Sequence, residues 1–378
     1  MDTTSEFIKR AAKRAGYRRD SYVERNLPTQ PSNILAVPLY GDIRSVFTAA
    51  TFLLRSYKEA NRDKYLILCS WPGFRGLFPY ADEFWSVEDE SVCRLLAAET
   101  CGFANNANVA AELTRSLVEV LDVMTAKDLS AYYSNGFTHK YMTDFREVMM
   151  HLPEVPSVSR VADDLRTQLS HRKGGRIVIY PATRMRSWQR GRAESLPVGR
   201  DFWLALANTL IDAGYTPVVY QNWFTHDLSR DLADRCVYLA SKDVSEVLAA
   251  IRHVGCVLDV HTDVSKLAVM ARCPFLSVTE RMIYVNEKDC ELDDLCCDGL
   301  GRQYIFSFST QLMQGGPEDW KSSVLDNVTA RLAKFLPRVA DAETPPTTER
   351  WEKADYTKVR MKRAKHLGSR FIRTAKRS

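Results

Sequence analysis

The 378-residue sequence contains no long hydrophobic run: no stretch approaches 18 consecutive apolar residues, the length that a membrane-spanning helix needs. Its first twenty residues, MDTTSEFIKRAAKRAGYRRD, are basic but have no apolar core like that of a signal peptide. We therefore expect a cytoplasmic protein. Hydrophobic residues make up 45% and charged residues 26%, as in an ordinary globular chain, and the length favours two domains.

The sequence also has no zinc-type motif. Its nine cysteines include no CxxC pair, and no histidines lie near them at zinc-ligand spacing. An odd number cannot all form internal disulfides. We expect reduced, mostly buried thiols, no bound metal and no cofactor.

Two nucleotide-binding signatures are missing as well. No GxGxxG follows the first predicted strand, and no GxxxxGK[ST] occurs anywhere. These absences disfavour dinucleotide-dependent oxidoreductases and P-loop nucleotide hydrolases.

What the sequence does contain is two alternations of buried strands and amphipathic helices. We predict strands over 33–40, 65–70, 83–87, 176–180, 216–221, 256–260, 274–279 and 304–309, and helices over 5–19, 43–61, 200–214, 243–255 and 265–273. Continuous apolar strands separated by helices favour parallel sheets covered on both faces. The predicted fold is α/β, with two Rossmann-like βαβ domains facing a cleft. The predicted regions are a basic helix at 1–30, domains at 31–170 and 171–337, and a linker with a basic amphipathic tail at 338–378.

Ligands of parallel sheets bind beyond the carboxyl ends of the strands, so residues directly after the strands are the candidates. The segment TRMRSWQRGR after one strand reads as a loop with four arginines, of which Arg184 and Arg186 come first. Guanidinium groups bind phosphate bidentately, so this loop suits a diphosphate, although a solvated basic loop has the same composition. The other candidates after strands are Asp42, Thr183, Gln221, the run His261, Thr262, Asp263, Ser265 and Lys266, and Glu280.

The run from His261 to Lys266 leads from a strand into a helix. A helix start offers free N–H groups and a positive dipole end, which favour phosphate. Thr262, Asp263 or Ser265 would equally serve as helix caps.

These features together resemble a GT-B glycosyltransferase, and their order resembles the heptosyltransferases of lipopolysaccharide assembly. The matching features are Gly41-Asp42 opening a helix, GLFPYADEFWSV after the second strand, a Thr/basic loop followed by Trp, and a D-T-G-x-x-H-L-A register. In that register this chain reads HTDVSKLA, so His261, Asp263 and Lys266 replace the family's Asp, Gly and His.

The resemblance implies an inverting, metal-independent transfer of a sugar from a nucleotide-sugar donor to a hydroxyl acceptor. Asp42 takes the position of the base that removes the acceptor's proton; from the residues alone it could also be a plain helix cap. The donor diphosphate would contact Thr183, Arg184, Arg186, Gln221, Glu280 and the His261–Lys266 turn, where basic groups stabilise the leaving group. For the acceptor we expect contacts with Gly41, Arg44 and His139.

The last 21 residues, Lys358–Ser378, contain nine basic residues and no acid, which exceeds the whole net charge of +5. Apolar residues recur there every three or four positions, as in a helix lying on an anionic membrane, which would suit a glycolipid acceptor in bacterial surface glycan synthesis. Contact with nucleic acid, by an enzyme that glycosylates a hydroxylated base, is the second interpretation, and a solvated tail the third. A non-catalytic nucleotide- or sugar-binding protein, or an epimerase, would share the same architecture.

Overall fold

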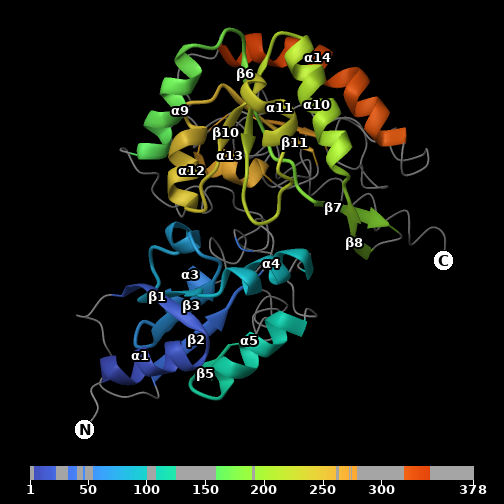
Figure 1. Cartoon of the computed structure of the whole chain (residues 1–378). Coiled ribbons are helices and arrows are strands. Elements are labelled where there is room, and N and C mark those ends of the chain that lie inside the picture. Colours follow the sequence, from blue (N-terminus) through green and yellow to red (C-terminus); the bar gives the residue numbers. More distant parts are fainter. Residues whose placement is uncertain are drawn as a thin grey trace, which may run out of the picture.

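The computed structural model of the chain consists of two α/β halves, an N-terminal half (residues 4–124) and a C-terminal half (residues 159–340) (Figure 1). The residues that the structure describes are 4–22, 33–40, 46, 54–99, 108–124, 159–189, 192–260, 264–271, 273, 275–278 and 319–340. Each half is built on a five-stranded sheet. The predicted α/β fold with two Rossmann-like domains is confirmed.

The sheet of the N-terminal half has the order β1-β4-β3-β2-β5. The pairs β4–β3, β3–β2 and β2–β5 are parallel, and β1 is antiparallel to β4. Every residue of β3 and β4 is buried, including Glu83 and Ser86 of β4. The elements are α1 (Thr4–Arg14), β1 (Tyr17–Tyr22), β2 (Ile34–Pro38), α3 (Arg55–Ala60), β3 (Tyr65–Ser70), η4 (Phe74–Leu77), β4 (Glu83–Val87), α4 (Glu90–Glu99), α5 (Asn108–Val118) and β5 (Asp122–Val123).

The N-terminal segment differs from its prediction. We predicted a helix over 5–19, but α1 ends at Arg14 and the chain reverses at Gly16, whose φ of +81° favours glycine. The following residues form β1, which is joined to β4 by an ion pair between Arg19 and the fully buried Glu83. That carboxylate also accepts hydrogen bonds from Tyr65 Oη (2.9 Å) and Trp85 Nε1 (2.7 Å), which together satisfy the buried charge.

The sheet of the C-terminal half is entirely parallel, with the order β10-β9-β6-β11-β12. Helices cover both faces: α9 packs on α12 and α12 on α13, whereas α14 packs on α10 (Figure 1). The elements are α9 (Arg160–Ser170), β6 (Arg176–Ile179), β7 (Arg184–Gln189), β8 (Arg192–Pro197), α10 (Arg200–Asp212), β9 (Thr216–Tyr220), α11 (Ser229–Leu232), η6 (Ala233–Arg235), β10 (Val237–Leu239), α12 (Val244–Ile251), β11 (Cys256–Val260), α13 (Ser265–Ala271), β12 (Phe275–Val278) and α14 (Asp319–Ala340).

The parallel strands of the two halves share one winding order. In the N-terminal half the first strand, β2, lies between β3 and β5; in the C-terminal half the first strand, β6, lies between β9 and β11. In both halves the chain therefore reverses its direction of progress across the sheet beside the first strand. The crevice at the carboxyl ends of the strands at such a switch point is where ligands bind in open α/β sheets. The switch points lie between β2 and β5, and between β6 and β11.

Two further segments differ from the sequence interpretation. The arginine-rich segment predicted as a loop is an antiparallel hairpin of β7 and β8, paired from Arg184↔Pro197 to Gln189↔Arg192. Helix α9 precedes the boundary expected at residue 170, yet it packs on α12 of the C-terminal half, where Ser159 Oγ hydrogen-bonds Glu246. The predicted strand over 304–309 and the basic tail lie outside the described residues.

Among the described cysteines, Cys69, Cys93, Cys236, Cys256 and Cys273 are all buried and form no disulfide. Within the described ranges, no helix has both the length and the apolarity required to cross a membrane.

Candidate functional site

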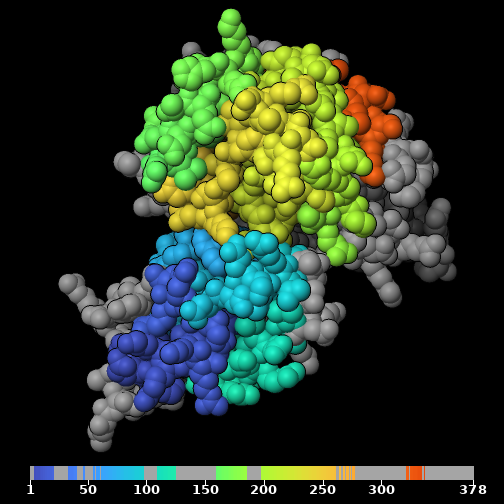
Figure 2. All heavy atoms as spheres, viewed as in Figure 1, coloured from blue at the N-terminus to red at the C-terminus, as the bar shows by residue number. Residues whose placement is uncertain are grey.

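The two halves meet at the carboxyl ends of their strands. Trp71, directly after β3, packs edge-on against Phe224, which lies in the β9–α11 loop (residues 221–228), with ring centroids 4.9 Å apart. The segment that leads into η4 contacts the start of α12. Figure 2 shows the blue N-terminal half resting against the yellow region around α12. The strand ends at which ligands bind in such sheets thus lie on the sides of the two halves that face each other.

The tightest part of this junction depends on two glycines. Val244 N donates to Gly73 O at 2.9 Å, linking the main chains of the two halves. A Cβ on Gly73 would lie 1.9 Å from Lys242 O, and one on Gly76 would lie 1.7 Å from Ser245 Oγ. Gly73 also has a φ of +85°, which L-side chains rarely adopt. Glycine at both positions therefore permits the close approach of the two halves.

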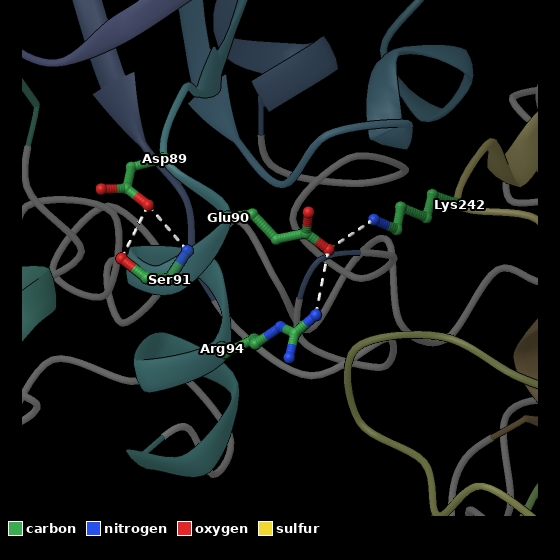
Figure 3. Close-up of polar contacts among 5 residues, drawn as sticks. All are labelled: Asp89, Glu90, Ser91, Arg94 and Lys242. Atoms are coloured by element: carbon green, nitrogen blue, oxygen red, sulfur yellow. Dashed lines mark hydrogen bonds and ion pairs between the residues drawn. The ribbon is translucent and has the colours of Figure 1, made fainter.

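A charged side chain spans the edge of the junction. Lys242 Nζ lies 3.1 Å from Glu90 Oε1 of α4, which also pairs with Arg94 at 3.5 Å (Figure 3). The same ammonium lies 3.9 Å from the ring centroid of Trp223, in cation–π contact. The hydrogen bond from Lys242 is the main cause that lowers the pKa of Glu90. Among the described residues, none is a hydrogen-bond partner of the buried indole N–H of Trp223.

At the C-terminal half's switch point, the turn after β6 is joined to the β9–α11 loop. Thr183 N donates to Phe224 O at 2.8 Å, and His226 N donates to Pro181 O at 2.8 Å. The Thr183 hydroxyl donates to Phe224 O as well, at 3.2 Å. The predicted donor contact Thr183 therefore lies just after β6, one of the two strands at the switch point, and its hydroxyl proton is used to hold this turn to the β9–α11 loop.

Asn222 organises the same loop. Its Oδ1 accepts from Tyr180 Oη (2.9 Å) and from Phe224 N (2.9 Å), and its Nδ2 donates to Tyr220 Oη (3.2 Å). Burial raises the pKa of Tyr220 to about 12, so its hydroxyl stays protonated at neutral pH. This network fixes the loop that carries Phe224 to the junction.

Gln221 is also engaged in the loop. Its Nε2 donates to Asp227 Oδ1 at 3.1 Å, and Asp227 accepts from both the N–H and the hydroxyl of Ser229 at the start of α11. Those hydrogen bonds from Ser229 lower the pKa of Asp227. Gln221 follows β9 as predicted, and the hydrogen bond from its amide group to Asp227 holds the loop in place.

The described arginines of this segment, Arg184, Arg186 and Arg192, lie on the two strands of the β7–β8 hairpin. Arg184, at its base, is exposed, and Arg186 is two positions further along β7. At about 3.3 Å per residue, the six residues of β7 extend about 16 Å. The segment that we predicted as a loop therefore has Arg184 and Arg186 at alternate positions of one strand, and Arg192 begins the next strand.

The remaining predicted contacts follow the strands that define the switch points. Tyr40 is the last described residue before Gly41-Asp42, and Ser265 and Lys266 begin α13 directly after β11. The side chains of Ser265 and Lys266 are not among those described. The predicted positions outside the described residues are Gly41, Asp42, Arg44, His139, His261, Thr262, Asp263 and Glu280.

Sequence reasoning missed the junction itself. Only a Pro-Gly turn in SWPGFRG hinted that the chain after β3 has a special conformation. Over the described part of the chain, no three His, Cys, Asp or Glu side chains lie together as a metal site would require.

No protein-family model matches the chain, and no curated protein matches it in sequence. In structure it is similar to a family 9 glycosyl transferase from Veillonella parvula (9% identity, 80% of this chain, 97% of that chain, TM-score 0.46). It is also similar to ADP-heptose lipopolysaccharide heptosyltransferase II from E. coli (13% identity, 80% of this chain, 98% of that chain, TM-score 0.39). A third similar structure is that of a putative UDP-N-acetylglucosamine 2-epimerase from Listeria monocytogenes (10% identity, 83% of this chain, 92% of that chain, TM-score 0.34).

Proposed function

We propose that the chain is a GT-B glycosyltransferase that moves a sugar from a nucleotide-sugar donor to a hydroxyl acceptor with inversion. The observation that carries the proposal is the placement of its chemical groups. The predicted base follows β2 at one switch point, and Thr183, Arg184 and the His261–Lys266 turn follow β6 and β11 at the other. Because the strand carboxyl ends of the two halves face each other, an acceptor on one half and a donor on the other can react across the junction.

The N-terminal half would hold the acceptor. Asp42 lies two residues beyond the last described residue of the β2 end, and as a carboxylate it can accept the proton of the attacking hydroxyl. Gly41, Arg44 and His139 would contact the acceptor, as the resemblance implies. The acceptor that fits this proposal is a glycan or glycolipid of bacterial surface polysaccharide synthesis.

The C-terminal half would hold the nucleotide-sugar. Thr183 and Arg184 follow β6, and the His261–Lys266 turn follows β11, so they flank one switch point. Basic groups in these segments, Lys266 among them, would stabilise the departing nucleoside diphosphate without a metal. Gln221, Glu280 and Arg186 are the further proposed donor contacts.

The test is release of nucleoside diphosphate from a panel of nucleotide sugars, measured with and without lipopolysaccharide-core or glycolipid acceptors. We expect one donor to be consumed faster when acceptor is present, with the product's anomeric configuration inverted by NMR. Full activity after treatment with a chelator would agree with a metal-independent mechanism. Binding without any turnover would favour the non-catalytic alternative instead.

The basic segment Lys358–Ser378 would bring the enzyme to an anionic membrane surface that carries its acceptor. Flotation with vesicles containing anionic lipid, compared between the full chain and a chain ending at residue 350, tests this. Tail-dependent binding to DNA in place of vesicles would favour the nucleic-acid interpretation.

A further inference from the structure

The end of β2, immediately before Gly41-Asp42, is held by two hydrogen bonds to β3. Leu39 N donates to Cys69 O at 2.8 Å, which extends the pairing with β3 by one residue. Ser70 Oγ then donates to Leu39 O at 2.7 Å. Both main-chain groups of Leu39 are thereby satisfied, and its side chain is buried. The chain therefore leaves the sheet at a fixed point.

The next residue, Tyr40, is held by a second strand, β1. Its hydroxyl is hydrogen-bonded to the hydroxyl of Tyr17, the first residue of β1, and both side chains are buried. The Tyr17 ring lies against Trp85, with ring centroids 6.0 Å apart. Burial raises the pKa of both tyrosines, so the pair stays protonated and neutral.

The antiparallel direction of β1 makes this contact possible. Because β1 runs opposite to β4, its first residue, Tyr17, pairs with Val87 at the carboxyl end of β4. Three strand spacings of about 4.8 Å separate β1 from β2, or about 14 Å, a gap that two tyrosine side chains can close by meeting end to end. A parallel strand at the same edge would place its first residue at the opposite end of the sheet.

We propose that Tyr17 is a positioning residue for Asp42: its hydroxyl fixes Tyr40 and thereby fixes where the next two residues begin. The proposal rests on the proposed function, in which Asp42 is the base. Two residues span at most about 7 Å, so the position of Tyr40 limits where Asp42 can lie. Misplacing a catalytic group by about 1 Å can reduce the rate many-fold.

The test compares Tyr17→Phe with Tyr65→Phe in the full chain. Both changes remove one buried hydroxyl from the same half, but Tyr65 Oη donates to Glu83 Oε2 at the amino end of β3, away from the Asp42 side. We expect Tyr17→Phe to lower kcat about 3- to 10-fold with the donor KM unchanged, and Tyr65→Phe to leave kcat within about 2-fold. Tyr40→Phe should match Tyr17→Phe, and the double variant should be no slower, because all three remove the same hydrogen bond.

Hydrogen exchange provides a readout that does not depend on activity. In Tyr17→Phe, amides of the peptide covering residues 39–46 should exchange faster than in the wild-type chain, whereas Tyr65→Phe should leave them unchanged. If the wild-type chain turns over no nucleotide sugar, the proposed function fails while the exchange experiment still tests the contact. Wild-type exchange in Tyr17→Phe, or an equal loss of kcat in Tyr65→Phe, would overturn the proposal.

Discussion

The two halves repeat one strand order, but their strand ends are held in different ways. In the N-terminal half, the end of β2 is held by Tyr17, which belongs to an added antiparallel strand at the far edge of the sheet. In the C-terminal half, the ends of the neighbouring strands β6 and β9 are held by Asn222, through Tyr180 and Tyr220. The first contact joins two strands that lie three positions apart in the sheet; the second is confined to two adjacent strands.

The strand order therefore does not determine which side chains hold the carboxyl ends of the strands, where ligands bind, in place. The apolar strands give each half its core, while hydrogen bonds of a few tyrosine and asparagine side chains set the loop positions. Changes at these polar links should therefore alter loop placement and rate, whereas changes at the junction glycines should alter how the halves fit together. The predictions below separate these effects.

The largest expected effect comes from Asp42 at the braced end of β2. If Asp42 is the base, Asp42→Asn should reduce kcat by about 100-fold or more, with the melting temperature nearly unchanged. The matched control is Asp122→Asn, the same chemical change at an exposed residue of the adjacent strand β5. Steady-state kinetics and thermal unfolding of both variants check this. Near-normal turnover together with a modest loss of stability would identify Asp42 as a helix cap.

Gly73→Ala should have the next largest effect, because it places a side chain against Lys242 O across the junction. Gly214→Ala is the control, since Gly214 has nearly the same φ (+84°), but no atom of the described residues lies within 4 Å of a Cβ added there. We expect Gly214→Ala to cost about 1 kcal/mol of unfolding free energy from the left-handed backbone alone. Gly73→Ala should cost about 2 kcal/mol more, measured by urea unfolding.

Hydrogen exchange adds a local check on that prediction. The Val244 amide, which donates to Gly73 O, should lose protection in Gly73→Ala and keep it in Gly214→Ala. Equal unfolding free energies and equal protection in the two variants would contradict the close approach of the halves.

The sequence predicts those parts of the fold that depend on local apolar pattern. The bounds of β3, β4 and β11 are confirmed to the residue, because each is an uninterrupted buried run. In contrast, β1 has the polar sequence YRRDSY, and its place in the sheet depends on Arg19 meeting Glu83, a contact between residues far apart in the chain. No periodicity within β1 could have revealed that pairing.

The candidate site divides in the same way. Asp42, Thr183 and Gln221 could be selected from sequence because they follow predicted strands. Ligands of parallel sheets bind beyond the carboxyl ends of the strands, so residues at these positions are candidate ligand contacts. The junction could not, because Gly73 and Lys242 are ordinary turn residues until the halves are placed together. The arginine loop was misread because its alternation is fixed only by pairing between β7 and β8.

Asn222→Ala should have a smaller effect, confined to the hydrogen bonds that hold the ends of β6 and β9 in the C-terminal half. It removes two acceptor contacts and one donor contact, which we expect to cost about 2 kcal/mol of unfolding free energy. Asn208→Ala is the control, since Asn208 makes one exposed contact with Arg235 (2.8 Å) and should cost less than about 0.5 kcal/mol. Urea unfolding of the two variants decides: equal losses would show that Asn222 is not the organising residue.

The smallest expected effect is at the exposed ion pair between Glu90 and Lys242. Folding lowers the pKa of Glu90. The ion pair's contribution to stability is therefore complete when the pH is above the ordinary glutamate pKa of about 4.3. The contribution is lost only as the pH falls through the lowered value. Exchange of the Val244 amide should therefore respond to Glu90→Gln at neutral pH, and the difference from the wild-type chain should vanish in acid.

Glu119→Gln is the matched control, because Glu119 pairs with Arg14 at 3.7 Å on the surface of the N-terminal half, away from the junction. Raising the ionic strength to 1 M shortens the screening length to about 3 Å and should also remove the effect of Glu90→Gln. If Glu119→Gln changes Val244 exchange as much as Glu90→Gln does, or if the difference disappears between pH 8 and pH 6, the pair does not hold the junction. In that case the main-chain contact at Gly73 would be what aligns the two halves.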